Sequence, residues 1–217
     1  HWVGGMGVLV FAMAVLPMTD GRAMHLMRAE VPGPTCGKLS SKLSDSAKIL
    51  YGIYFAMTAL EVVFLCAGGM SLYESLIHSF GTAGTGGFSN RGLSIGAYQN
   101  PYFEWVIGIF MLLFGINFNL YYFILMRHFR EAFGSEELRA YLGIVLFSTV
   151  TIAANILSMV GSVGEAVRTA FFQVSSIITT TGYATADFNL WPTYSRILLL
   201  VLMFVGGCAG STAGGLK

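Results

Sequence analysis

Two short strings of glycine, threonine and an aromatic residue are the parts of this sequence best suited to chemistry. They pair position by position at a spacing of 95 residues, as Thr85-Gly86-Gly87-Phe88 and Thr180-Thr181-Gly182-Tyr183. A glycine can turn its carbonyl oxygen into an orientation that a side chain resists, and a threonine adds a hydroxyl to its own carbonyl. Such strings can therefore offer several oxygen atoms to a cation without any catalytic group.

Both strings resemble the Thr-Val-Gly-Tyr-Gly filter of potassium channels, whose backbone carbonyls replace the water around a dehydrated K⁺. In such a filter, the aromatic residue packs behind the carbonyls. One string alone could equally be a glycine-rich surface turn. Two strings, each following a short apolar helix, favour the filter over the turn.

The segments that must position the strings are too short to cross a membrane. Residues 71–89 and 164–184 begin with apolar residues at helical spacing and end in a string. Each helical run lasts about a dozen residues, whereas a span needs roughly 20. Non-helical backbone at membrane depth is tolerated only where it is buried in protein or lines water. We therefore predict two re-entrant pore loops within an internal repeat.

The composition is that of a membrane protein. Apolar residues make up 55% of the 217 residues and charged residues only 11%, against about 25% charged in a soluble domain. We predict an all-α polytopic membrane protein with complete spans at 49–70, 102–126 and 140–160 and partial spans at 2–16 and 191–209. A net charge of +1 provides no basic field for nucleic acid, so soluble enzymes and nucleic-acid-binding proteins are excluded.

The basic residues give an orientation. Nine of the twelve Lys and Arg residues lie in residues 19–48, in residues 127–139 or at Lys217, and this excess predicts that these regions face the cytoplasm. The expected division is a second span of a truncated first unit (1–18), a cytoplasmic loop (19–48), a second helix–pore loop–helix unit (49–126), a cytoplasmic loop (127–139) and a third such unit (140–217).

A further glycine-rich stretch, residues 206–215, is called the glycine segment below. Its residues are Gly206, Gly207, Cys208, Ala209, Gly210, Ser211, Thr212, Ala213, Gly214 and Gly215. Small residues four apart can form a helix-packing face, but each glycine also weakens a helix by about 1 kcal/mol. Beside two filter-like strings, a movable gating loop is the favoured interpretation.

Polar residues inside the predicted spans need partners. Asn117 and Asn119 either face a cavity below the strings or make hydrogen bonds between helices, and the sequence does not decide between these roles. Glu61 is an intramembrane carboxyl, for which we favour a structural role in holding a pore helix. Arg168 and Glu165 are expected to form a pair at the outer mouth.

Enzyme and metal motifs are weak. The three cysteines form no CxxC pair, so neither a disulfide framework nor a zinc site is indicated. Residues 92–96 fit GxSxG without the strand, turn and helix that the motif needs. Residues 210–217 have Leu where a nucleotide-binding loop needs Lys. An intramembrane hydrolase using Ser94 or His78 is the least favoured alternative.

Several motifs together resemble a known family. The two strings, Gly-Gly-Met-Gly at 4–7, Arg-Ala-Glu-Val-Pro-Gly-Pro at 28–34 and the stretch 206–217 resemble the Trk/Ktr/HKT potassium transporters, most closely their bacterial TrkH branch. The resemblance implies four units around one pore, homodimers in the lipid bilayer of the cell inner (plasma) membrane, and a cytosolic nucleotide-binding regulatory ring of the TrkA type. It implies K⁺ as the transported ion and no other cofactor.

By the same resemblance, the two strings are the second and third quarters of a K⁺ filter, and the glycine segment is an intramembrane gating loop. The first filter and the fourth unit are absent, so the chain is expected to be a fragment. A non-conducting subunit of a pore assembly therefore stays open as an alternative. Any Na⁺ permeation would be read most clearly from the missing first filter.

Overall fold

The computed structural model describes residues 1–7, 43–128, 130 and 134–216, and within these residues the regular structure is entirely helical. The helices are α1 (Trp2–Gly5), α4 (Leu43–Ala67), α5 (Leu72–Ala83), α6 (Pro101–Phe114), α7 (Phe118–Leu125), α9 (Glu136–Val160), α10 (Val163–Ile178) and α11 (Thr193–Val205), with short 3₁₀ turns at Ser94–Tyr98 and Phe188–Leu190. Residues 19–42 of the predicted loop 19–48, the motif at 28–34 and most of the partial span 2–16 lie outside the described residues. Residues 43–48 of that predicted loop are helical and begin α4.

Two helices are long and apolar enough to cross a bilayer. They cover Ala47–Ala67 and Glu136–Val160, which agrees with the spans predicted at 49–70 and 140–160. Serine fixes the beginning of α9, because the Ser135 side chain accepts a hydrogen bond from the backbone of Leu138. Gly161 ends that helix in the left-handed conformation, at φ +80°.

The span predicted from 102 to 126 is not one straight helix but two helices that together are apolar and long enough for a broken span. α6 ends at Phe114, and α7 begins at Phe118 after a bend of 91°. Asn117 is the N-cap of α7, and its side-chain oxygen accepts a hydrogen bond from the backbone of Asn119 at 2.9 Å. The hydrophobicity of the sequence predicted a single span because the residues on both sides of the break are equally apolar.

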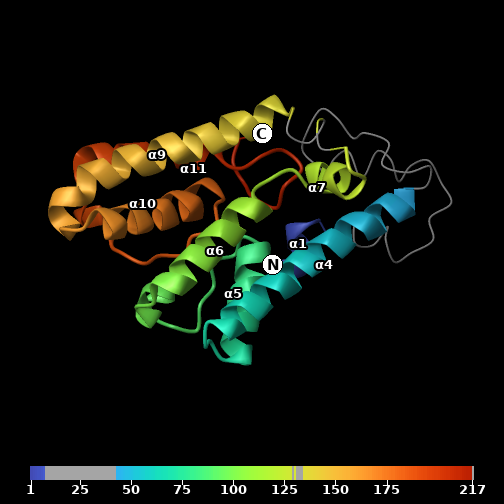
Figure 1. The fold of residues 1–217 in the computed structure, drawn as a ribbon, viewed down its shortest axis with the longest axis horizontal. Coiled ribbons are helices and arrows are strands. Elements are labelled where there is room, and N and C mark those ends of the chain that lie inside the picture. The colour runs from blue at the N-terminus through green and yellow to red at the C-terminus, as the bar shows by residue number, and fades with distance from the viewer. Residues whose placement is uncertain (8–42, 129, 131–133, 217) are drawn as a thin grey trace.

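The short helices expected before the strings are confirmed. α5 has 12 residues and α10 has 16, and both end directly before a string. In the ribbon, α4, α5 and α6 lie side by side, while α10 packs between α6 and α9 (Figure 1). The two groups of helices therefore meet where α10 contacts α6.

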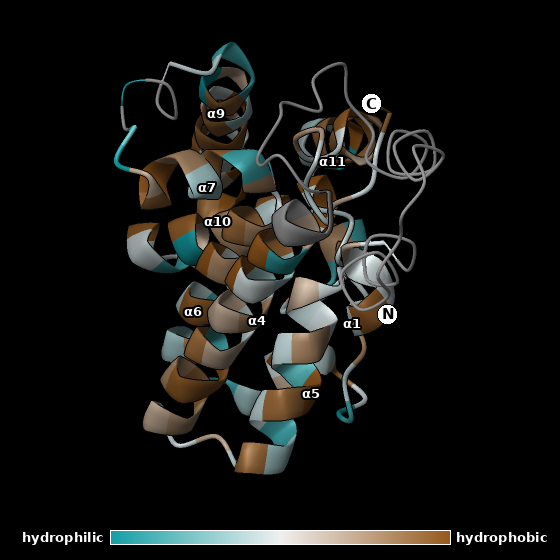
Figure 2. Ribbon diagram, turned by 90° about the vertical axis from the view of Figure 1, so that its right-hand side faces the viewer, coloured by the Kyte–Doolittle hydropathy of each residue, from teal (hydrophilic) through white to brown (hydrophobic). Residues whose placement is uncertain are grey.

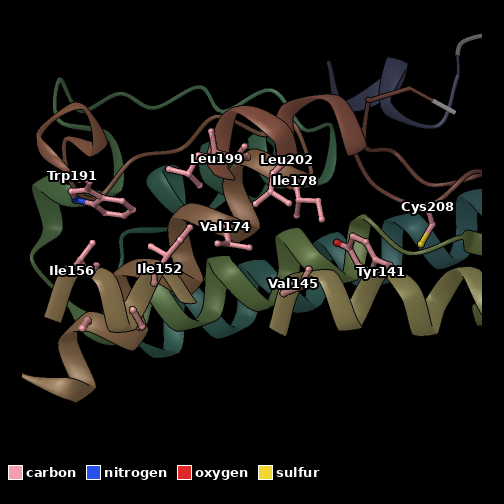
Figure 3. Packing of buried hydrophobic residues seen from close by; sticks show 14 residues of the cluster. Tyr141, Val145, Ile152, Ile156, Val174, Ile178, Trp191, Leu199, Leu202 and Cys208 are labelled. Carbon is pink, nitrogen blue, oxygen red and sulfur yellow. The ribbon is translucent and has the colours of Figure 1, made fainter. Parts of the chain in front are cut away.

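The helices bury apolar residues between them and expose apolar residues outward. One core joins α9, α10 and α11, with Trp191 at one end and Cys208 beside Tyr141 at the other (Figure 3). Phe147 of α9 and Phe204 of α11 are each about 60% exposed, and apolar colour covers the outer sides of these helices (Figure 2). An apolar exterior of this kind is suited to hydrocarbon rather than to water.

Candidate functional site

The first string leaves the end of α5 with its backbone N–H groups turned back into the helix. The Thr85 N–H donates to Thr82 O at 3.1 Å, and the N–H groups of Gly86 and Gly87 both donate to Gly81 O, at 2.7 and 3.4 Å. Thr85 and Gly87 have positive φ angles of +51° and +65°, whereas Gly86 between them does not. The sign of φ therefore alternates along the string.

The second string repeats this arrangement 95 residues later. The Thr180 N–H donates to Ile177 O at 3.0 Å, and the N–H groups of Thr181 and Gly182 both donate to Ser176 O, at 3.0 and 3.3 Å. Thr180 and Gly182 have φ angles of +57° and +90°. The donors, the acceptors and the backbone twist all correspond between the two strings.

The first three carbonyl oxygens of each string have no hydrogen-bond donor among the described residues. Within the described residues, no donor reaches the carbonyls of Thr85, Gly86, Gly87, Thr180, Thr181 or Gly182. Most backbone carbonyls away from water accept a hydrogen bond. A row of unpaired carbonyl oxygens held by a rigid helix end is therefore suited to take a cation in place of its water.

Positions 87 and 182 favour glycine for different reasons. A Cβ atom on Gly87 would overlap the carbonyl oxygen of Thr181, so the strings touch there with no room for a side chain. Gly182 has open space where its Cβ would lie, and its positive φ is what favours glycine. A side chain at 182 would therefore project into the space beside the second string.

The aromatic residues of the strings differ. Tyr183 is fully buried, and its hydroxyl donates to the carbonyls of His78 and Phe88 at 3.0 and 3.1 Å. Phe88 is 60% exposed and has an edge-to-face contact with His1. Tyr183 is thus buried, as expected for the aromatic residue of a string, whereas Phe88 is largely exposed in this chain. The tyrosine joins the end of the first string to the helix behind it.

Glu61 lies behind the first string, near Thr82 and Tyr183. Its side chain is fully buried, and its carboxyl oxygens have no hydrogen-bond partner among the described residues. The hydroxyl of Thr82 donates instead to the carbonyl of His78 at 2.8 Å. The structure thus places Glu61 in the core that supports the string, beside Thr82 of α5.

The glycine segment follows α11 and returns across the strings. The Gly214 N–H donates to the hydroxyl of Thr180 at 2.8 Å, and the Thr85 hydroxyl donates to the carbonyl of Thr212 at 3.1 Å. A Cβ atom on Gly214 would lie 2.9 Å from the Thr180 hydroxyl. The segment therefore bonds to a threonine of each string.

The break between α6 and α7 holds the other side of the glycine segment. The Cys208 N–H donates to Gly115 O at 2.9 Å, and the Phe118 N–H donates to Gly210 O at 2.9 Å. The Thr212 hydroxyl and N–H both reach the carbonyl of Phe114. The bend thus exposes backbone groups that a continuous helix would have used internally.

Asn117 and Asn119 lie at this break. A Cβ atom on Gly210 would come 3.0 Å from the side-chain oxygen of Asn117, and that oxygen also caps α7. Asn117 therefore has a third role that the sequence interpretation did not include, since it starts a helix and borders the glycine segment. Asn119 lies in the first turn of α7 and is partly buried.

A charged residue that the sequence interpretation missed also reaches the glycine segment. The Glu137 carboxylate accepts a hydrogen bond from the Ala209 N–H at 2.6 Å. Glu137 stands in the first turn of α9. The contact joins positions 72 residues apart, and no local sequence signal announces it.

Ion pairs join residues near the beginnings of α5, α6 and α10 to one another or to a neighbouring loop. Arg168 of α10 contacts Glu104 of α6 at 2.9 Å, while the expected partner Glu165 is 3.9 Å away. Arg91 contacts Glu74 at 2.6 Å. Partial burial opposes ionisation of Glu74, but hydrogen bonds from Arg91 and Asn90 hold the pKa of its carboxyl below its usual value.

The enzyme interpretation has no geometry to support it. The ring of His78 contacts the carbonyl of Glu74 and the hydroxyl of Ser89, whereas the hydroxyl of Ser94 accepts from the Ala184 N–H. The two residues therefore form no nucleophile and base pair. Among the described residues, no three His, Cys, Asp or Glu side chains are grouped to hold a metal ion.

Apolar helices around carbonyl-lined strings define a membrane transport protein rather than an enzyme. The sequence model of a family described as "TrkH: Cation transport protein" matches residues 1–217. The chain belongs to the TrkH family of cation transport proteins.

Individual relatives agree with this assignment. The Trk system potassium uptake protein TrkH of Escherichia coli strain K12 is 38% identical over 222 residues, covering all of this chain and 46% of that protein. TrkG of the same organism is 35% identical over 221 residues and is covered to 45%. The crystal structure of the potassium transporter TrkH from Vibrio parahaemolyticus matches 99% of this chain and 44% of that one, with a TM-score of 0.80 at 31% identity. The chain thus spans about half the length of these relatives.

Proposed function

We propose that this chain forms part of a channel-like pathway for K⁺ uptake across the cell inner membrane. In this proposal, residues 85–88 and 180–183 are two quarters of a selectivity filter, and ions pass down their electrochemical gradient. The names of the similar proteins, Trk system potassium uptake proteins, support K⁺ as the transported ion. The remaining quarters belong to parts of the protein beyond this chain.

The observation that carries the proposal is the matched pair of strings. Each donates its N–H groups to the preceding helix, and three successive carbonyl oxygens of each have no donor in the part of the chain that the structure describes. Carbonyl oxygens in a ring replace the hydration shell of a monovalent cation. Two equivalent strings from two repeated units are what a pseudo-fourfold ring of such oxygens requires.

The glycine segment is the gating loop of this pathway. Its hydrogen bonds to Thr85 and Thr180 place it directly against both strings, where it obstructs ions leaving the filter. The units 49–126 and 140–217 each supply a helix, a pore loop and a helix, with the loop 127–139 between them on the cytoplasmic side. The segment 1–18 belongs to a preceding unit.

The whole protein assembles as a homodimer with one pore in each protomer and is regulated by a cytosolic nucleotide-binding ring of the TrkA type. The resemblance of the chain to Trk-system proteins supports both assignments. The basic loops 19–48 and 127–139 are the surfaces that this ring would contact.

Rubidium uptake tests the proposal. The full reading frame is expressed in cells that lack their own K⁺ uptake, as the native protein and as Gly182→Asp, at matched surface expression. The aspartate enters the open space beside the second string, and we expect uptake to fall at least tenfold. Gly92→Asp is the matched control, because Gly92 is exposed, has open space around it and lies outside the strings.

We expect the Gly92→Asp protein to keep most of the native uptake. Equal uptake by the native and Gly182→Asp proteins would overturn the filter assignment. If none of the three expressed proteins takes up rubidium, the result would instead support a non-conducting assembly subunit.

A further inference from the structure

The contacts of the glycine segment divide into two kinds. Towards the strings and the α6–α7 break, its partners are backbone groups and threonine hydroxyls. At Ala209, the partner is the carboxylate of Glu137. Among the described contacts of the segment, this is the one made by a charged side chain.

The Glu137 contact is short and accessible. An ionised acceptor makes a shorter and stronger hydrogen bond than a neutral one, and the oxygen of Glu137 lies 2.6 Å from the Ala209 nitrogen. The side chain is exposed, and no described Lys or Arg lies within ion-pair distance of it. The bond is therefore a charge-assisted contact that solvent or a cation can reach.

A cavity of about 260 Å³ separates the glycine segment from α9 beside this bond. Glu137, Ala140 and Tyr141 of α9 line one side, and residues 205–209 line the other. The segment is therefore not closely packed against α9 along this cavity. The carboxylate of Glu137 bridges the space and holds Ala209 at a fixed distance from α9.

The position of Glu137 connects this restraint to the cytoplasmic side. Glu137 lies in the first turn of α9, directly after the loop 127–139, and Ser135 fixes where that turn begins. A partner that moves this loop, or that places a cation on the carboxylate, would act on Ala209 without contacting the strings. The chain thus holds a direct mechanical link from its basic loop to the glycine segment.

We infer that Glu137 is a latch that holds the glycine segment closed and through which events at the cytoplasmic loop 127–139 release it. The inference rests on the proposed function, because the glycine segment regulates flux only if ions pass the strings. Glu137 acts as a positioning residue that contacts the segment and no transported ion.

The test uses the full-length protein in liposomes without any regulatory protein. Rubidium flux is compared between the native protein, Glu137→Ala, Glu137→Gln and Glu136→Ala. The last variant is the matched control, because Glu136 is also an exposed acid in the first turn of α9 but makes no described contact with the segment. Both alanine variants remove one helix-start charge equally.

We expect Glu137→Ala to raise unregulated flux at least threefold, and Glu136→Ala to leave it within the error of the native value. Glu137→Gln is expected between the two, since its amide oxygen still accepts a hydrogen bond without the charge. Unchanged or reduced flux in a well-folded Glu137→Ala protein would overturn the latch.

A second measurement is independent of flux. Cys208 is 2% exposed beside Ala209, and its labelling by a thiol reagent can be followed by peptide mass spectrometry. We expect faster labelling in Glu137→Ala than in Glu136→Ala, and equal rates would count against the latch. If the native protein conducts and loses flux through Gly182→Asp while Glu137→Ala changes neither readout, only the latch fails. If the native protein is silent, the proposed function fails first.

Discussion

At the scale of single residues, the strings depend on backbone shape more than on side-chain chemistry. Thr85 and Thr180 are not glycines, yet both adopt positive φ angles, which cost a side-chain residue about 1–2 kcal/mol. A strained backbone persists where the surroundings determine it. Here the return hydrogen bonds to Gly81 and Ser176 provide that determination.

Gly87→Ala tests the contact between the strings. The new Cβ would overlap the carbonyl of Thr181 and would also carry the strain of a positive φ, so we expect at least a tenfold loss of rubidium uptake. Gly69→Ala carries similar strain at φ +94° but meets open space, and it should retain most uptake. Comparable uptake by both variants would show that the strings do not need this close approach.

The ion pair between Glu74 and Arg91 predicts that the stability of the protein depends on pH. The pKa of Glu74 is lowered in the folded protein, so its pairing with Arg91 stabilises the fold above the usual carboxyl range and is lost as the pH falls through the lowered pKa. We expect the thermal midpoint of the native protein to fall between about pH 5 and pH 3 by more than that of Glu74→Gln. Parallel pH curves for the two proteins would contradict this assignment.

At the scale of elements, the contact between α6 and α10 joins the two helix groups. Arg168 and Glu104 are 22% and 11% exposed at this contact, so each charge depends on the other. Trp105 of α6 also stacks on Phe171 of α10, with ring centroids 4.8 Å apart. The pore helix α10 is thus fixed to the helix that precedes the break.

A double-mutant cycle measures the coupling free energy between Arg168 and Glu104. Removing Arg168 alone should destabilise the protein by about 3 kcal/mol, because it leaves a largely buried carboxylate unpaired. Removing Glu104 in the same protein should restore part of that loss. Unfolding in detergent by a chemical denaturant gives the coupling, and additive effects of the two substitutions would show that the pair is not coupled.

Sequence patterns found the elements more reliably than their breaks. Both strings and their short helices were predicted because glycine and threonine have specific backbone roles. The break after Phe114 could not be predicted from hydrophobicity, because the residues on both sides are equally apolar. Gly115 followed by the helix-capping Asn117 was a usable signal for it. The contact of Glu137 with Ala209 could not be predicted, since tertiary packing alone brings these residues together.

At the scale of the whole molecule, orientation in the membrane decides which side controls the glycine segment. The excess of positive residues supports our proposal that the loop 127–139 faces the cytoplasm. In that orientation, the 3₁₀ turns at Ser94–Tyr98 and Phe188–Leu190 would lie outside, around a cavity of about 540 Å³.

Cysteine labelling tests the orientation. Gly92→Cys should react with a membrane-impermeant maleimide in intact cells, while Ser135→Cys should react only after the cells are permeabilised. The unsubstituted protein gives the background from its own cysteines. The reverse pattern would place the Glu137 latch on the outer side and remove its link to a cytosolic partner.

The contact between the two ends of the glycine segment affects how fast the segment can move. The Gly207 N–H bonds to Gly214 O at 3.1 Å, and a Cβ atom on Gly206 would overlap that same oxygen. The two ends of the segment are therefore already joined, as in an Ω-loop. Swinging away and returning as one body costs no loop-closure entropy. We expect the segment to move as one hinged body with a low entropic barrier. The time it spends in each position should then depend on its few hydrogen bonds to the strings, the α6–α7 break and Glu137.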